Sequence, residues 1–87
     1  MKLTYWICHH MTDHSCYSYR ARTKRECLDY LNNPNMPEDE RKFRQANHSQ
    51  PKKVEVLYDS AFHLMELCNS EGGLWEENQS REEAFKE

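Results

Sequence analysis

The 87-residue chain has no long hydrophobic run, because no apolar segment approaches the roughly 20 residues that a membrane-spanning helix needs. It also has no charged-then-apolar leader, so we expect no signal peptide and a reducing compartment. In such a compartment the four cysteines are expected to be thiols or metal ligands rather than disulfides. The sequence therefore predicts a cytoplasmic protein without a membrane partner.

An excess of basic residues is missing as well. The net charge is −3 and the isoelectric point is about 5.9, whereas a nucleic-acid-binding domain is usually basic. Hydrophobic residues make up 37% of the chain and the mean hydropathy is −1.13, so polar surface dominates. The length suffices for one domain with one modest core. We find no internal repeat, and we expect part of the chain to be unpacked.

The richest apolar pattern extends from Lys52 to Cys68. Val54, Val56 and Tyr58 recur with a period of two, which predicts a half-buried strand. Asp59 or Ser60 would then cap a helix that ends near Ser70, before two glycines. The apolar stripe of this helix consists of four residues at helical spacing, which Phe62 and Leu67 widen: Ala61, Leu64, Met65 and Cys68.

Two further strands are expected near the beginning of the chain. Residues 2–8 and 16–22 both alternate, and the polar segment 9–15 reads as the loop between them. Strands so close in sequence most simply form an antiparallel hairpin. Because residues 2–8 have bulky side chains on both faces, we expect this strand to be central and to be covered on one side and partly on the other.

A short helix follows the hairpin. Thr23 and Glu26 have the spacing of a capping box, and Cys27, Leu28 and Leu31 then form an apolar face. Residues 32–51 are expected to form a charged, mobile connection, within which residues 37–47 are either a solvated helical turn or a loop. Residues 77–87 are expected to form a disordered acidic tail or a frayed helix.

The order strand, strand, helix, strand, helix predicts an α+β fold. We expect residues 1–76 to form a two-layer ββαβα sandwich, in which two helices cover one face of a three-stranded sheet. The exposed edges of so small a sheet make a homodimer possible. The predicted core consists of Leu28, Leu31, Val54, Val56, Leu64 and Met65.

The most specific chemical candidate is a cysteine and histidine cluster in the hairpin, made of Cys8, His10, His14 and Cys16. Two thiolates and two imidazoles suit a structural, tetrahedral zinc site. The spacing is not that of a standard CxxC knuckle, however, and a cysteine at a strand end is often a small buried hydrophobe. A Cys8–Cys16 disulfide is another alternative. We expect Cys27 and Cys68 to pack in the core.

Two surface features are candidate binding sites. Arg20, Arg22, Lys24 and Arg25 form a basic cluster that would suit an acidic protein partner. Tyr17 and Tyr19 interleave with it, and they either stack nucleic-acid bases or pack on the helices. Trp75, among carboxylates, either folds back as a lid over the core, which is the favoured interpretation, or anchors an interface.

Several segments together resemble a family of small uncharacterised proteins of cyanobacteria and chloroplasts. They are MKLTYW, YSYRARTKRE, PKKVEVLY, AFHLMELC and EGGLWE, and they cover most of the chain except residues 32–50 and the tail. The resemblance implies a soluble protein of photosynthetic cells, on the cytosolic or stromal side. It implies no catalytic activity. The histidine-rich loop and the charged insert depart from the usual pattern of the family.

The sequence offers a histidine and cysteine set but no oriented third group or oxyanion hole, so we expect no enzyme and no cofactor. The leading hypothesis is a small regulator or adaptor of a photosynthetic cell that acts by protein–protein contact through Arg20, Arg22, Arg25 and Trp75. The alternatives are a zinc-binding or thiol redox module built on the hairpin loop, and a binder of single-stranded nucleic acid.

Overall fold

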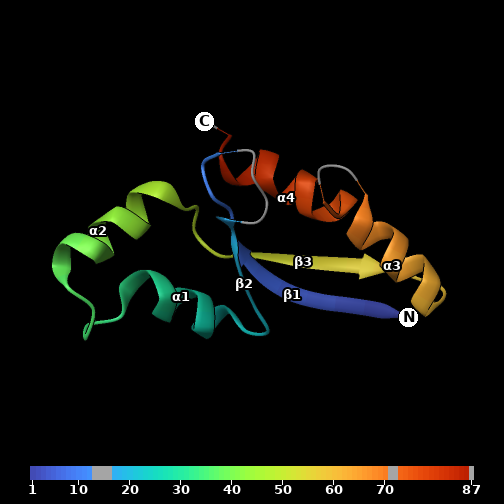
Figure 1. Ribbon diagram of the computed structural model, residues 1–87, viewed down its shortest axis with the longest axis horizontal. Helices are drawn as coiled ribbons and strands as arrows, with labels where there is room; N and C mark the ends of the chain where they lie inside the picture. Colours follow the sequence, from blue (N-terminus) through green and yellow to red (C-terminus); the bar gives the residue numbers. More distant parts are fainter. Residues whose placement is uncertain (13–16, 71–72, 87) are drawn as a thin grey trace.

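The computed structural model describes residues 1–12, 17–70 and 73–86. In this part of the chain an antiparallel sheet has the strand order β2-β1-β3 (Figure 1). The strands are β1 (Lys2–Cys8), β2 (Tyr19–Ala21) and β3 (Lys52–Leu57). The helices are α1 (Lys24–Asn32), α2 (Glu38–Asn47), α3 (Ala61–Asn69) and α4 (Trp75–Ala84). The α+β class, the three-stranded sheet and the central position of the first strand are confirmed.

The helices lie on both faces of the sheet, so the prediction of two helices on one face is wrong (Figure 1). On one face Ile7 packs with Val56 of β3 and with Leu74, which precedes α4. On the other face Cys8 packs with Leu31 of α1. Successive side chains of a strand point to opposite faces, and β1 has large apolar residues on both. Each face therefore needs its own helix to exclude water.

The predicted core is confirmed in part. Val54, Val56 and Leu31 are fully buried, whereas Leu28 and Leu64 are only half-buried. Met65 is 51% exposed, so its assignment to the core is wrong. Helix α3 reaches the sheet core through Leu67. A residue two positions away on a helix points roughly to the opposite side, and this is why Met65 faces outward.

Helix α1 begins where the sequence predicts. The hydroxyl of Thr23 accepts a hydrogen bond from the backbone N–H of Glu26 at 3.2 Å. The carboxylate of Glu26 accepts from the N–H of Arg22 at 3.3 Å, one residue before the cap. Ser60 caps α3 in the same way, accepting from the N–H of His63 at 3.1 Å. Both helix starts were therefore readable from the sequence.

The cap of α1 leads to a first prediction. We expect Thr23→Ala to lower the free energy of unfolding by about 1 kcal/mol, because it leaves the N–H of Glu26 without its partner. Thr23→Ser retains the accepting oxygen and is the matched control, so its free energy of unfolding should stay close to that of the wild-type protein. Urea denaturation measures both. Equal losses in the two variants would contradict a role for the hydroxyl.

Helix α2 occupies half of the expected mobile connection and corresponds to the solvated-helix alternative. None of its residues is buried, and Phe43 is largely exposed. Acidic residues fill its first turn, where the helix dipole favours negative charge. The helix is held to α1 from outside the core, because the guanidinium of Arg44 donates to the carbonyl of Tyr30 at 3.1 Å. Gln45 similarly donates to the carbonyl of Leu31 at 3.1 Å.

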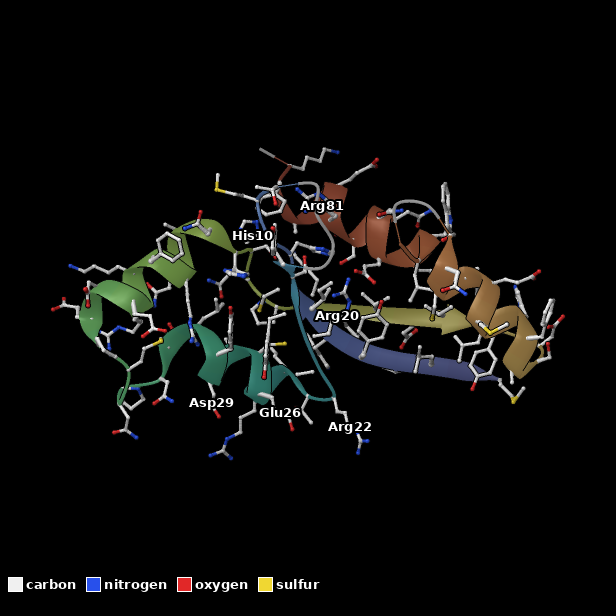
Figure 2. The ribbon with its side chains drawn as sticks, in the orientation of Figure 1. His10, Arg20, Arg22, Glu26, Asp29 and Arg81 are labelled. Atoms are coloured by element: carbon white, nitrogen blue, oxygen red, sulfur yellow. The ribbon has the colours of Figure 1, made fainter. Side chains whose placement is uncertain are left out.

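Helix α4 occupies most of the segment that the sequence assigns to a disordered tail or frayed helix. Leu74 enters the sheet core just before it, and Glu77 of its first turn is buried. Near its other end the guanidinium of Arg81 donates to the carbonyls of His10 and Met11 (Figure 2).

Within residues 1–12, 17–70 and 73–86, no helix has both the length and the apolar character needed to cross a bilayer.

Candidate functional site

An open pocket of about 480 Å³ lies on the α4 face of the sheet. Leu3 and Tyr5 of β1 form its floor, and the end of β2 forms one side. Cys68, Leu74 and Glu77, from the ends of α3 and α4, line the opposite side. Most of this lining is apolar, with a polar group at one end, which is the usual character of a binding site.

The turn between α3 and α4 shapes the pocket. Gly73 has a φ of 87°, a conformation that residues with a β-carbon rarely adopt. Its N–H donates to the carbonyl of Ser70 at 3.1 Å, and the hydroxyl of Ser70 donates to the carbonyl of Leu67 at 2.8 Å. These bonds end α3 and direct the chain so that Leu74 enters the core. The pocket therefore lies between the ends of two helices that a glycine turn connects.

A hydrogen-bonded group of three side chains closes the polar end of the pocket. The hydroxyl of Tyr5 donates to Oε2 of Glu77 at 2.5 Å. The guanidinium of Arg20, from the edge strand β2, forms an ion pair with Oε1 of the same carboxylate. Glu77 is only 5% exposed, so the hydrogen bonds from Tyr5 and Arg20 take the place of those to water that a buried carboxylate loses. This network joins both edges of the pocket.

The chemistry of this network suits binding better than proton transfer. Burial, together with the hydrogen bond to Glu77, raises the pKa of Tyr5 far above its ordinary value, so the phenol stays protonated. Both carboxylate oxygens of Glu77 already accept hydrogen bonds within the network. A base or nucleophile needs an available lone pair aimed at a substrate. The groups here instead hold one another in place.

His9 is a second buried polar residue that joins β1 to other elements. Its Nε2 lies 3.3 Å from the hydroxyl of Ser80 on α4, and its backbone N–H donates to the hydroxyl of Ser49 at 3.0 Å. Its side chain is 2% exposed. Burial is the main cause that lowers the pKa of His9 to about 4; the negative charge of Glu77 opposes this shift and the positive charge of Arg81 adds to it. His9 is therefore neutral at pH 7.

The proposed metal ligands are only partly within the described residues. Cys8 is buried against α1, where its thiol lies 3.9 Å from the carbonyl of Cys27. Burial raises the pKa of Cys8 to about 12, so it is a thiol and not a thiolate. His10 is half-buried, with Nδ1 2.8 Å from the hydroxyl of Thr12. His14 and Cys16 lie outside the described residues. Among the residues that the structure describes, no group of three or more histidine, cysteine, aspartate or glutamate side chains is arranged to hold a metal ion.

Arg20 lies apart from the other residues of the predicted basic cluster. Arg20 points under α4 toward Glu77, whereas Arg22 lies with Glu26 at the outer rim (Figure 2). Arg25 is exposed on α1. Trp75, at the start of α4, is 64% exposed, so the prediction that it folds back over the core is wrong. Its neighbour Leu74 fills that place instead.

The remaining sequence expectations divide between packing and exposure. Tyr19 stacks on Tyr30 of α1, with ring centroids 4.0 Å apart and an interplanar angle of 2°, so it packs on a helix. Tyr17 is exposed. Cys27 is buried as expected, but Cys68 is exposed, so its place in the core is wrong. Cys68 lies three residues from Met65, on the side of α3 that faces outward.

Sequence reasoning missed the buried polar residues. Glu77 lies in a run of acidic residues that resembles a solvated tail, and His9 lies in a polar loop sequence. Tyr5 was assigned to a strand without a partner. Glu76 and Glu77 lie in the first turn of α4, and acidic residues at this position are typical of a helix start. This signal could have revealed α4, but nothing in the pattern indicates that one of its carboxylates is buried.

No protein-family model matches the chain, and neither a curated protein nor a solved structure shows significant similarity to it.

Proposed function

We propose that this protein is a small non-enzymatic regulator or adaptor that acts by protein–protein contact. Its binding surface consists of the pocket together with Phe62, Met65 and Cys68 of α3, and we name it the α3 surface. Following the resemblance to proteins of cyanobacteria and chloroplasts, we place it in a photosynthetic cell, on the cytosolic or stromal side. The partner is a protein.

The observation that supports this proposal is the exposure of α3. Of its nine residues, four have apolar side chains larger than that of alanine and a fifth is a cysteine, yet none of the nine is buried. Phe62 is 65% exposed and Met65 is 51% exposed. Met65 and Cys68 are three residues apart and therefore lie on one side of the helix, leading to the pocket that Cys68 lines. Contiguous apolar surface of this kind marks interaction sites in soluble proteins.

Other candidate contact residues lie beside the α3 surface. Trp75 follows Leu74 at the edge of the pocket, and exposed tryptophan is typical of interface hot spots. Arg22 lines the pocket at its outer rim. Arg20 is engaged with Glu77, and its role is to position that carboxylate. Charge reversal at Arg20 would place two carboxylates together, so it would test stability rather than binding.

Affinity capture tests this function. We expect Phe62→Glu and Met65→Glu, separately and together, to reduce capture of a specific partner from a cyanobacterial lysate by at least about tenfold, because a charge would be buried in the interface. Phe43→Glu is the matched control, since Phe43 is 67% exposed but lies on α2, far along the chain from α3. Quantitative mass spectrometry of the captured proteins provides the measurement.

The variants should keep their circular dichroism spectra and melting temperatures, because neither side chain is buried. If all three substitutions reduce capture equally, or if none does, the α3 surface is not the binding site. Either result would remove the structural basis for this function.

A further inference from the structure

Strand β1 is longer than β2, so part of this edge of β1 is paired with no strand among the described residues. Strand β2 pairs only with Trp6, Ile7 and Cys8, and the chain then leaves the sheet at Thr23 to begin α1. On its other edge β1 pairs with β3 over residues 2–7. The first half of β1 is therefore paired on one side only.

The unpaired side exposes backbone groups of Lys2 and Thr4. The amino group of Met1 donates to the carbonyl of Tyr58 at 2.8 Å, and the N–H of Tyr58 donates back at 2.9 Å. Odd-numbered residues of β1 therefore direct their backbone groups toward β3, and even-numbered residues direct theirs toward β2. Beyond the end of β2, no residue that the structure describes forms a backbone hydrogen bond with Lys2 or Thr4.

The pocket lies beside this open edge. In an antiparallel sheet, residues directly opposite each other have side chains on the same face. A strand added next to β1 would thus direct the side chains opposite Leu3 and Tyr5 toward the α4 face. Leu3 and Tyr5 are the floor of the pocket, which Leu74 and Cys68 border. Alternate side chains of an added strand would therefore enter an apolar site.

The charge at the end of this edge indicates one further property of the occupant. Arg22 follows directly after β2 and lines the pocket, and its side chain is exposed. Lys24 lies over the ring of Trp6 at 5.7 Å, and Arg25 is exposed on the same first turn of α1. Basic residues thus surround the place where β2 ends, and a carboxylate there would gain favourable contacts.

We propose that the open edge of β1 accepts an extended segment of the protein partner as an additional strand. The backbone of this segment pairs with Lys2 and Thr4, an apolar side chain enters the pocket, and an acidic residue lies beside Arg22. Recognition by strand addition is a general mode in which backbone bonds give affinity and pockets select alternate side chains. The inference rests on the proposed function and specifies the form of the partner at the same surface.

The first measurement needs only the free protein. In amide hydrogen exchange followed by NMR, we expect the Thr4 amide to exchange at least about tenfold faster than those of Tyr5 and Ile7, which face β3. A Thr4 amide as protected as its neighbours, in a protein that is dimeric by sedimentation, would show that a second copy occupies the edge. That result would overturn the inference.

The second measurement uses a peptide. A phage-displayed library of random 12-residue peptides is selected on the full chain, and the best binder is synthesised. We expect it to alternate apolar residues, to contain an acidic residue, and to protect the Thr4 amide at least about tenfold when bound. N-methylation of its backbone should reduce affinity at least about tenfold at alternate positions only, because only those N–H groups face β1.

Variants of the protein separate this binding mode from the proposed function. Thr4→Pro removes the edge N–H and should weaken the peptide at least about tenfold, while its N–H is not needed within the sheet. If this variant fails to fold, the N-methylation series still decides. A peptide that binds without protecting Thr4 overturns the inference. In that case, capture that remains sensitive to Phe62→Glu and Met65→Glu would leave the proposed function standing.

Discussion

Replacing Glu77 with alanine is expected to lower the free energy of unfolding by about 3 kcal/mol. Removing one partner of a buried ion pair typically costs 3–5 kcal/mol, and the partial exposure of Arg20 reduces the cost. The substitution also leaves the hydroxyl of Tyr5 without its acceptor, in a half-buried position. Urea denaturation with a tryptophan fluorescence or circular dichroism signal measures the change.

This loss should be visible as a decrease in melting temperature of more than about 10 °C, given the usual scaling for a domain of this size. Glu83→Ala is the control, because Glu83 is an exposed glutamate on the same helix. Glu77→Gln retains the shape and one accepting oxygen, and its loss should be intermediate. If Glu77→Ala and Glu83→Ala are equally stable, the network is not a structural element.

Acidification should destabilise the fold because His9 is buried as a neutral ring. The pKa of His9 is about 4 in the folded protein, whereas the ordinary value that we assign to the unfolded chain is 6.5. Between these values the unfolded chain binds the proton more readily than the folded protein does. The stabilisation from a neutral His9 is therefore complete above pH 6.5 and is lost as the pH falls toward 4. The total corresponds to about 3 kcal/mol, of which about 2 kcal/mol is lost between pH 7.5 and pH 5.

The measurement is a series of urea denaturation curves between pH 7.5 and pH 5. His9→Gln does not titrate, so its stability should fall by about 2 kcal/mol less over this range than that of the original protein. Identical slopes for His9→Gln and the original protein would contradict a buried neutral ring.

Local patterns were sufficient for most secondary-structure elements. Alternation identified β3 because Val54 and Val56 both face the core, and side-chain oxygens identified the helix starts at Thr23 and Ser60. These features depend on neighbours within about four residues, so they are present in the sequence itself. The length of β2 was overestimated because strand pairing with β1, and not the alternation of its own residues, determines where it ends.

The candidate site was much less predictable. The basic residues of the expected cluster are close in sequence, but Arg20 and Arg25 separate because one lies on a strand and the other on a helix against the opposite face. Leu74 takes the buried place that sequence reasoning gave to Trp75, since only one of two adjacent residues can point into the core. No residue pattern near Arg20 and Arg25, or near Leu74 and Trp75, predicts these two outcomes.

The sequence by itself determined the α+β class, the caps of α1 and α3, and the burial of Val54, Val56, Leu31 and Cys27, whereas the strand order was left open. Tertiary structure alone decided that helices cover both faces, that α3 remains exposed beside a pocket, and that Tyr5, Arg20 and Glu77 meet. The physical reason is the range of the interactions. Propensity and capping act between near neighbours, whereas the burial of a carboxylate depends on cations and hydroxyls that lie more than 50 residues away in the chain.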